Sequence, residues 1–121
     1  MRTLAPLTIV LGCAAIGCAS TPLPTAEVAR AQTLVAQAES SQAQQYAAAD
    51  LDRARTKLQQ ANKAMDAKKP MPANQFATEA AADAEVAIAR SQAAQAEKSA
   101  AEVDASVEAL RSESQRNVRG Q

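Results

Sequence analysis

The feature that most constrains this chain is a helical pattern that runs from Ala73 to about Val118 with no glycine or proline. Apolar residues recur along it at alternating steps of four and three, the spacing of a helix stripe that packs against another helix. As one helix the segment would be roughly 65 Å long at 1.5 Å per residue. We call the recurring residues the apolar seam, which consists of Ala82, Val86, Ala89, Ala93, Ala96, Ala100, Val103, Val107 and Leu110.

The composition restricts the chain to an all-α fold. The 121 residues allow one domain at most, and they include one tyrosine, one phenylalanine and no tryptophan. Strong helix formers dominate, with alanine the most frequent. Because alanine removes little surface from water, a compact core would be thin. We therefore expect an elongated antiparallel helical hairpin or three-helix bundle with one long alanine-rich C-terminal helix.

Missing residue types exclude several kinds of chemistry. The chain has no histidine, the usual general base and metal ligand. Its 13 basic and 13 acidic residues balance, and no basic face or aromatic platform suits nucleic acid. There is no glycine-rich phosphate loop, and carboxylates such as Asp83 and Glu85 fall on different helix faces. We expect no catalytic residue, cofactor or metal, no nucleic-acid partner and no small-molecule substrate.

Residues 1–17 are typical of a lipoprotein signal peptide. Arg2 precedes an apolar run from Leu4 to Ile16 that is too short to span a membrane. The run ends in Ala15-Ile16-Gly17-Cys18, which resembles a lipobox, a site where a small residue precedes the cysteine that becomes the lipidated N-terminus. We predict cleavage between Gly17 and Cys18, with a diacylglycerol and an acyl chain such as palmitate on Cys18.

Cys13 is the alternative lipidation site, because Val10-Leu11-Gly12-Cys13 also fits the pattern. We favour Cys18, since a cut before Cys13 would leave an apolar stub on the mature protein. A plain secretory peptide with incidental cysteines is a further alternative. Ala19 follows Cys18, and the absence of aspartate there favours the outer membrane in Gram-negative bacteria. The expected location is the inner leaflet of the outer membrane, facing the periplasm.

A lipidated tether at residues 18–24 leads to a helical domain at 25–118, with helices at about 25–42, 48–67 and 73–118 and a frayed tail at 119–121. The segment Lys68–Pro72 contains two prolines, which disfavour helical geometry in the residues before them, and we expect it to end the second helix.

The apolar stripes of the first two helices are out of phase by one residue, about 100° around the axis. The segment 40–47 therefore contains either a turn or a stutter. The two stripes are Val28, Ala31, Val35 and Ala38, and Leu51, Ala54, Leu58, Ala61 and Met65.

The third helix is about twice as long as its neighbours, so half of it has no partner within the chain. The seam continues along this half as a candidate interaction surface, which we call the distal seam. An exposed apolar stripe can mark a contact with another protein. A solvated alanine-rich helix is an equally good interpretation of the same residues. The distal seam consists of Ala96, Ala100, Val103, Val107 and Leu110.

Two segments, Ala43–Ala61 and Phe76–Glu97, resemble the bacterial envelope family known as domain of unknown function family 4398. The first carries an aromatic, a leucine and a Lys-Leu pair at helical spacing, and the second opens with an aromatic followed by spaced alanines and Asp-Ala. The residues that match are Tyr46, Leu51, Ala54, Lys57, Leu58, Phe76, Ala77, Ala80, Asp83, Ala84 and Ala87. Members of the family are often lipoproteins, so the resemblance implies a helical fold and an envelope location but no activity.

Together these features favour a non-catalytic outer-membrane lipoprotein whose helical rod is a structural or protein-interaction element of the cell envelope. Its expected partners are the membrane, through the lipid, and a second copy or another envelope protein, through the third helix. The alternative is a periplasmic chaperone-like or lipid-handling module. That function needs an apolar cavity, and the sequence offers few large apolar residues to line one.

Overall fold

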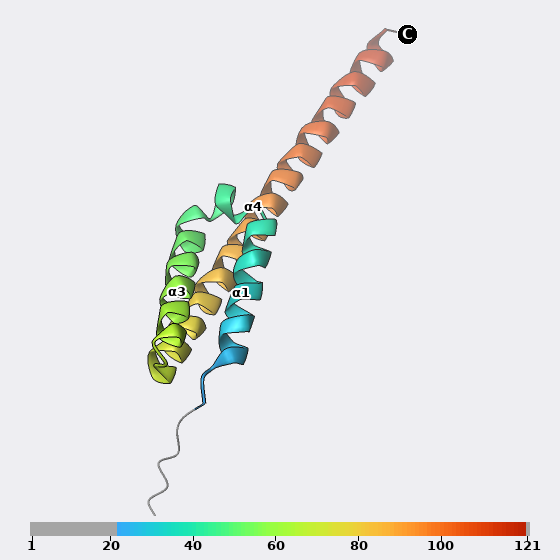
Figure 1. Cartoon of the computed structure of the whole chain (residues 1–121). Coiled ribbons are helices and arrows are strands. Elements are labelled where there is room, and N and C mark those ends of the chain that lie inside the picture. Colours follow the sequence, from blue (N-terminus) through green and yellow to red (C-terminus); the bar gives the residue numbers. More distant parts are fainter. Residues whose placement is uncertain (1–21, 121) are drawn as a thin grey trace, which may run out of the picture.

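The computed structural model describes residues 22–120, and this part of the chain consists of helices and short connections. Its elements are α1 (Thr25–Ser40), α2 (Ala43–Tyr46), α3 (Ala48–Asp66) and α4 (Pro70–Arg119). Helices α1 and α3 pack along the first part of α4, and α4 then continues alone (Figure 1). The predicted all-α fold with a long C-terminal helix is confirmed, and its form is the three-helix bundle. The predicted signal peptide and both cysteines lie outside the described residues.

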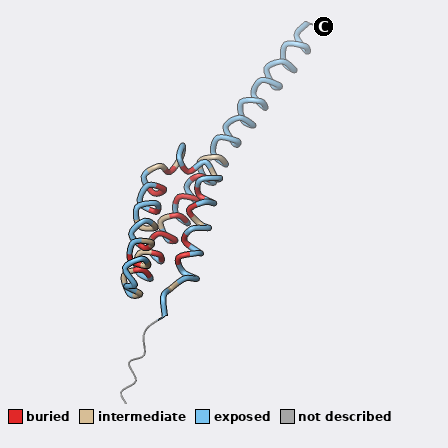
Figure 2. Tube along the Cα trace, viewed as in Figure 1, coloured by how far each residue is buried: buried red, intermediate tan, exposed pale blue. Residues whose placement is uncertain are grey.

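The core of the bundle is built mainly from alanine. The predicted stripe of α1 is buried, and so are Leu51, Ala54 and Ala61 of the α3 stripe, while Leu58 and Met65 are half-buried (Figure 2). Valine, leucine and isoleucine add larger side chains at only a few positions, and Phe76 is half-buried beside the end of α3. Each alanine buries little area, so the helices must approach closely for their core to form.

The chain breaks twice between α1 and α3. Gln42 has a left-handed conformation with φ of 63°, and Ala47 has a non-helical backbone with φ of −145° and ψ of 40°. Between them α2 makes a single turn of four residues, with Ala43 buried and Tyr46 half-buried. These breaks rotate the chain, so that α1 and α3 both present their stripes to α4. The one-residue phase difference in the sequence therefore marks a real turn and not a stutter.

The turn between α3 and α4 differs from its prediction. Lys68, with φ of 55°, ends α3 in a Schellman motif in which its own N–H and that of Lys69 donate to the carbonyls of Met65 and Ala64, both at 2.9 Å. Helix α4 then begins at Pro70 and not near residue 73. Proline fits the first turn of a helix, where the backbone N–H has no intrahelical acceptor. The two prolines thus start α4, which runs to Arg119, the first residue of the predicted frayed tail.

Alongside the bundle, α4 does not pack through the seam, so the prediction of its packing face was wrong there. Four seam residues, Ala82, Val86, Ala89 and Ala93, are exposed there. The buried set follows a second stripe with the same four-and-three steps, widened by Ala81 and Ile88 because α4 must contact two helices at once. We call this set the bundle face, which consists of Ala73, Ala77, Ala80, Ala81, Ala84, Ala87, Ile88 and Ser91.

Replacing Lys68 with glycine should stabilise the protein, because a non-glycine residue in the left-handed region carries a steric cost. We expect Lys68→Gly to raise the free energy of unfolding by about 0.5–1 kcal/mol. Chemical denaturation followed by circular dichroism would measure this change. The matched control is Ala67→Gly, where φ is −77° and glycine should destabilise the fold. Equal effects of the two substitutions would contradict this account of the turn.

Candidate functional site

The distal seam lies on the part of α4 that leaves the bundle. The last side-chain hydrogen bond between α4 and the rest of the bundle, among the described residues, runs from Gln95 Nε2 to the backbone carbonyl of Ser41 at 2.9 Å. From Ala96 to Gly120 every residue is exposed. We call Ala96–Arg119 the overhang; it is roughly 35 Å long at 1.5 Å per residue. All five predicted residues of the distal seam lie on it.

The seam is continuous along both parts of α4. Beside the bundle Val86 is 40% exposed, and on the overhang Val103 and Leu110 are 60% and 66% exposed. Exposed valine and leucine in one line are unlike isolated surface apolar residues, which need no explanation. The seam therefore forms one apolar line on the outer side of α4, and no other described element packs on it.

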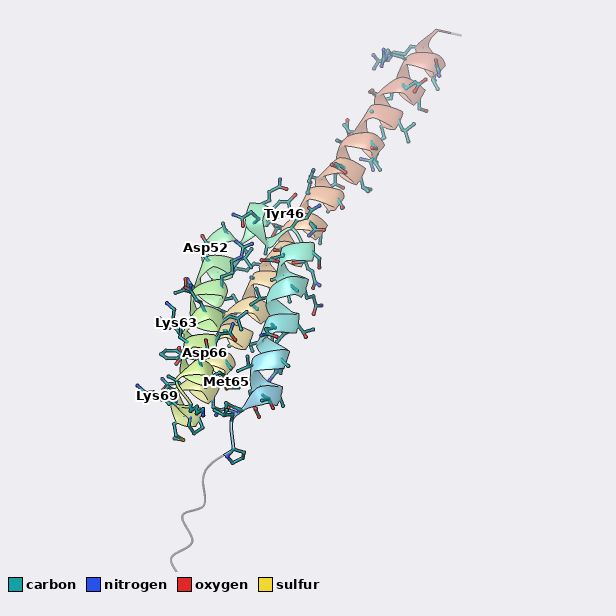
Figure 3. All side chains as sticks on the ribbon, in the orientation of Figure 1. Tyr46, Asp52, Lys63, Met65, Asp66 and Lys69 are labelled. Carbon is teal, nitrogen blue, oxygen red and sulfur yellow. The ribbon has the colours of Figure 1, made fainter. Side chains whose placement is uncertain are left out.

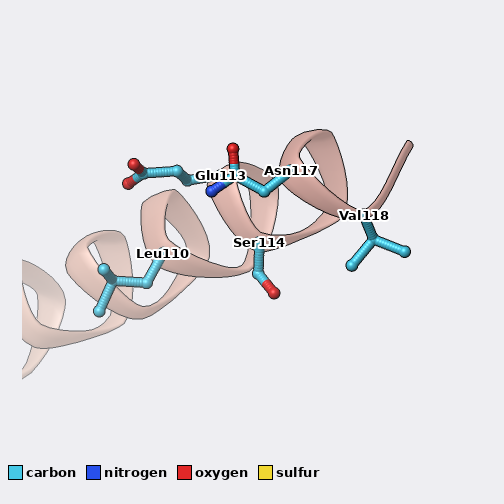
Figure 4. A pocket seen from close by; sticks show the side chains of 5 residues that line it. All are labelled: Leu110, Glu113, Ser114, Asn117 and Val118. Atoms are coloured by element: carbon cyan, nitrogen blue, oxygen red, sulfur yellow. The ribbon is translucent and has the colours of Figure 1, made fainter. Parts of the chain in front are cut away.

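A shallow hollow lies at the far end of the overhang, between Leu110 and Val118 (Figure 4). Glu113, Ser114 and Asn117 complete its lining, and all five residues belong to α4. Because no second element faces it, this hollow is a space between side chains of one helix. It extends the outer side of α4 and does not enclose a ligand.

A buried carboxylate joins the start of α3 to α4. The side chain of Asp50 is 2% exposed and forms ion pairs with Arg53 on α3 and Arg90 on α4. Its position in the first turn of α3 also places its negative charge near the positive end of the helix dipole. Sequence reasoning did not identify Asp50 as part of a charged site. The missing information was the partner from α4, which lies 40 residues away.

A second charged cluster lies between α3 and α4, closer to their turn. Lys57 Nζ is 2.9 Å from Asp83 Oδ2 and 3.3 Å from Glu79 Oε2. Asp83 Oδ2 is buried without a well-aligned hydrogen-bond donor among the described residues, so the nearby ammonium balances its charge. The contact with Asp83 raises the pKa of Lys57, and Glu79 adds to the effect. Hydrogen bonds from Gln75 and then Lys57 lower the pKa of Glu79.

Exposed ion pairs join the remaining helix faces. Arg30 on α1 is 2.6 Å from Glu85 on α4, and Arg55 on α3 is 2.8 Å from Glu39 on α1. As predicted, Asp83 and Glu85 lie on different faces, since Asp83 faces α3 and Glu85 faces α1. Such exposed pairs contribute at most about 1 kcal/mol each. They help to fix which helix sides meet.

The chain enters the bundle at the end that carries the α3–α4 turn. A shallow groove there contains Thr25 and Val28 of α1 and Met65 and Asp66 of α3. Figure 3 shows Met65, Asp66 and Lys69 at this end and Tyr46 at the opposite one. The overhang points away from the entry end (Figure 1). The two ends of the described chain are therefore at opposite ends of an elongated molecule.

Within residues 22–120, no three carboxylate or cysteine side chains gather closely enough to hold a metal ion. In the same range, no helix is both long and apolar enough to cross a membrane.

Comparison with protein families gives a match to Domain of unknown function (DUF4398) over residues 26–103. The matched range covers the whole bundle and reaches Val103 on the overhang. Curated proteins and solved structures give no significant match.

Substitution of Asp50 should destabilise the bundle. Asp50→Asn keeps the shape but removes the charge that Arg53 and Arg90 share, so we expect a loss of about 1–3 kcal/mol in the free energy of unfolding. The control is Asp52→Asn, because the Asp52 side chain is 67% exposed. Urea denaturation would measure both variants. A similar loss of unfolding free energy from both would show that the buried ion pairs of Asp50 do not stabilise the bundle more than an exposed aspartate does.

The Lys57 cluster should make stability depend on pH at both extremes. Because the pKa of Lys57 is raised from 10.5, its contribution is present below pH 10.5 and is lost as pH rises through the folded pKa. Because the pKa of Glu79 is lowered from 4.5, its contribution is present above pH 4.5 and is lost in acid.

Thermal unfolding of wild-type and Lys57→Gln protein across this pH range would test both signs. The variant should lose under about 1 kcal/mol at neutral pH, since these are partly exposed ion pairs. The difference between the two proteins should shrink in strong alkali and in acid. A difference that stays constant at all pH values would contradict the proposed pairing.

Proposed function

The chain belongs to the family Domain of unknown function (DUF4398), and we propose that it is a non-catalytic lipoprotein of the bacterial outer membrane. Its α4 seam acts as a structural or protein-interaction element on the periplasmic side. The family assigns no activity, so this proposal rests on the residues of the chain itself.

The observation that carries the proposal is the overhang. A helix that only closed the bundle would end near Gln95, since this residue makes the last described hydrogen bond to the bundle and every residue from Ala96 to Gly120 is exposed. Instead α4 continues to Arg119 and keeps the seam in line to Leu110. A protein contact along the seam is a use for this length that a bundle alone does not provide.

The proposed anchor and the rod have compatible directions. The lipobox residues Gly17 and Cys18 precede the first described residue by only a few positions. The entry end of the bundle would therefore lie near the membrane, with the overhang pointing away from it. A lipid on Cys18 would hold the seam at a fixed range of distances from the bilayer.

A chaperone-like or lipid-handling module is the alternative, and the bundle supports it less well. Such a module needs an apolar cavity or cleft. The space between the three helices is filled by alanine and a few larger side chains. The hollows that line the surface are shallow and partly polar.

Removing the proposed lipid attachment should release the protein from the membrane. We expect wild type to sediment with membranes and to incorporate labelled palmitate, while Cys18→Ala should do neither. The control is Cys13→Ala, which should behave as wild type because Cys13 lies in the segment that is removed. Loss of sedimentation in Cys13→Ala alone would assign the anchor to Cys13. A wild-type protein that is soluble and unlabelled would refute the proposal.

A further inference from the structure

Helix α4 carries apolar residues on two faces, and only one of them is used within the described chain. At about 100° per residue, Ala84 on the bundle face and Val86 in the seam are separated by a rotation of about 200°. They therefore lie on nearly opposite sides of the helix. The bundle face contacts α1 and α3, while the seam points away from both helices. The seam is thus available to a second molecule along its whole length.

The spacing of the seam suits a helical partner. Steps of four and three average 3.5 residues, whereas a straight helix has 3.6 residues per turn. A stripe with this period stays in contact only when two helices wrap around each other in a left-handed supercoil. From Ala82 to Leu110 the seam is roughly 40 Å long. A helix of similar length with the same repeat would match it, and a second α4 supplies one.

Charges beside the seam favour two parallel α4 helices in register. In this arrangement the residue before Val86 faces the residue five positions later in the other copy. Glu85 therefore faces Arg90 of the second copy, and symmetry repeats the pair. Further pairs along the seam combine one charged and one uncharged side chain, so like charges do not meet. These pairs are Gln92 with Glu97, Ser99 with Asp104, and Ser106 with Arg111.

Contacts within the chain are compatible with this pairing. Arg30 approaches Oε1 of Glu85, so Oε2 can accept another hydrogen bond. Arg90 contacts Asp50 through one terminal nitrogen, so other donors of its guanidinium remain. The side chains of Glu85 and Arg90 are 51% and 64% exposed. Both groups can therefore reach across an interface without breaking the bundle.

An antiparallel pair of overhangs fits less well. The register that opposes Val103 and Val107 places Asp104 beside Asp104 of the second copy, a like-charge contact, and places Glu97 beside Arg111, so its charges do not favour it clearly. It leaves Val86 and the other seam residues beside the bundle uncovered. The parallel arrangement is favoured because it buries the whole seam, including the part beside the bundle.

We propose that a second copy of this chain covers the seam, and that the two α4 helices form a parallel, in-register coiled coil from Ala82 to Leu110. The inference rests on the proposed function, because two copies anchored in one membrane point the same way. Membrane confinement also raises their effective concentration. A seam rich in alanine needs this help because it buries modest area.

Cysteine crosslinking in intact cells tests this inference with the full-length chain. Val86→Cys and Leu110→Cys place a thiol near each end of the seam, and Ala105→Cys places one on the opposite side of the overhang. After mild oxidation, both seam variants should form a species of two copies several-fold more than Ala105→Cys does. Wild type, treated in the same way, gives the background from the natural cysteines.

Other crosslinking patterns would overturn the inference. Crosslinking between co-expressed Leu110→Cys and Ala100→Cys chains, without self-crosslinking at position 86, would indicate the antiparallel pair. Seam crosslinks to a different protein, or equal yields from Ala105→Cys, would exclude the second copy as the specific partner. Membrane sedimentation of the same samples tests the lipid anchor separately. A result that refutes the dimer therefore leaves the proposal of a lipid-anchored protein open to its own test.

Discussion

The close approach of α1 and α3 to the alanine-rich bundle face of α4 is the interaction on which the rest of the structure depends. A face built from small side chains lets two helices lie against a third, but each contact removes little surface from water. Stability then relies on the sum of many small contacts and on the few larger residues Val35, Leu51 and Ile88. Ion pairs around the rim, with Asp50 buried among them, orient the three helices.

The same interaction explains how the overhang can exist. Starting a helix is unfavourable, because several residues must be ordered before the first hydrogen bonds form. The bundle holds the first turns of α4 in place, so the overhang only has to extend a helix that is already formed. Alanine, glutamate, arginine and glutamine then favour extension through their helix propensity. A pair between Arg111 and Glu108 at 3.7 Å adds a weak contact on the overhang.

Sequence reasoning predicted the all-α class, the stripes of α1 and α3, and the long last helix, because these follow from periodicity and composition. It also located the break before α3, since a one-residue phase shift cannot be absorbed by a straight helix facing one partner. It failed on the packing face of α4, where two alanine stripes share one spacing and Val86 made the outer one look more apolar. It also took Pro70 and Pro72 as a stop, although proline equally suits a helix start. Arg90 could be assigned as the partner of Asp50 only once the inward face of α4 was known. Because the sequence did not identify that face, this ion pair could not be predicted.

The bundle face and the seam lie on one helix, so a change in the length of α4 also changes the angle between the bundle and the distal seam. Inserting or deleting seven residues in the overhang would move its tip by about 10 Å and leave the distal seam in line with the rest. A change of four residues would instead rotate everything beyond it by about 40°, while the bundle behind it stayed intact. The reach of the tip from the bundle is therefore adjustable only in steps of a heptad.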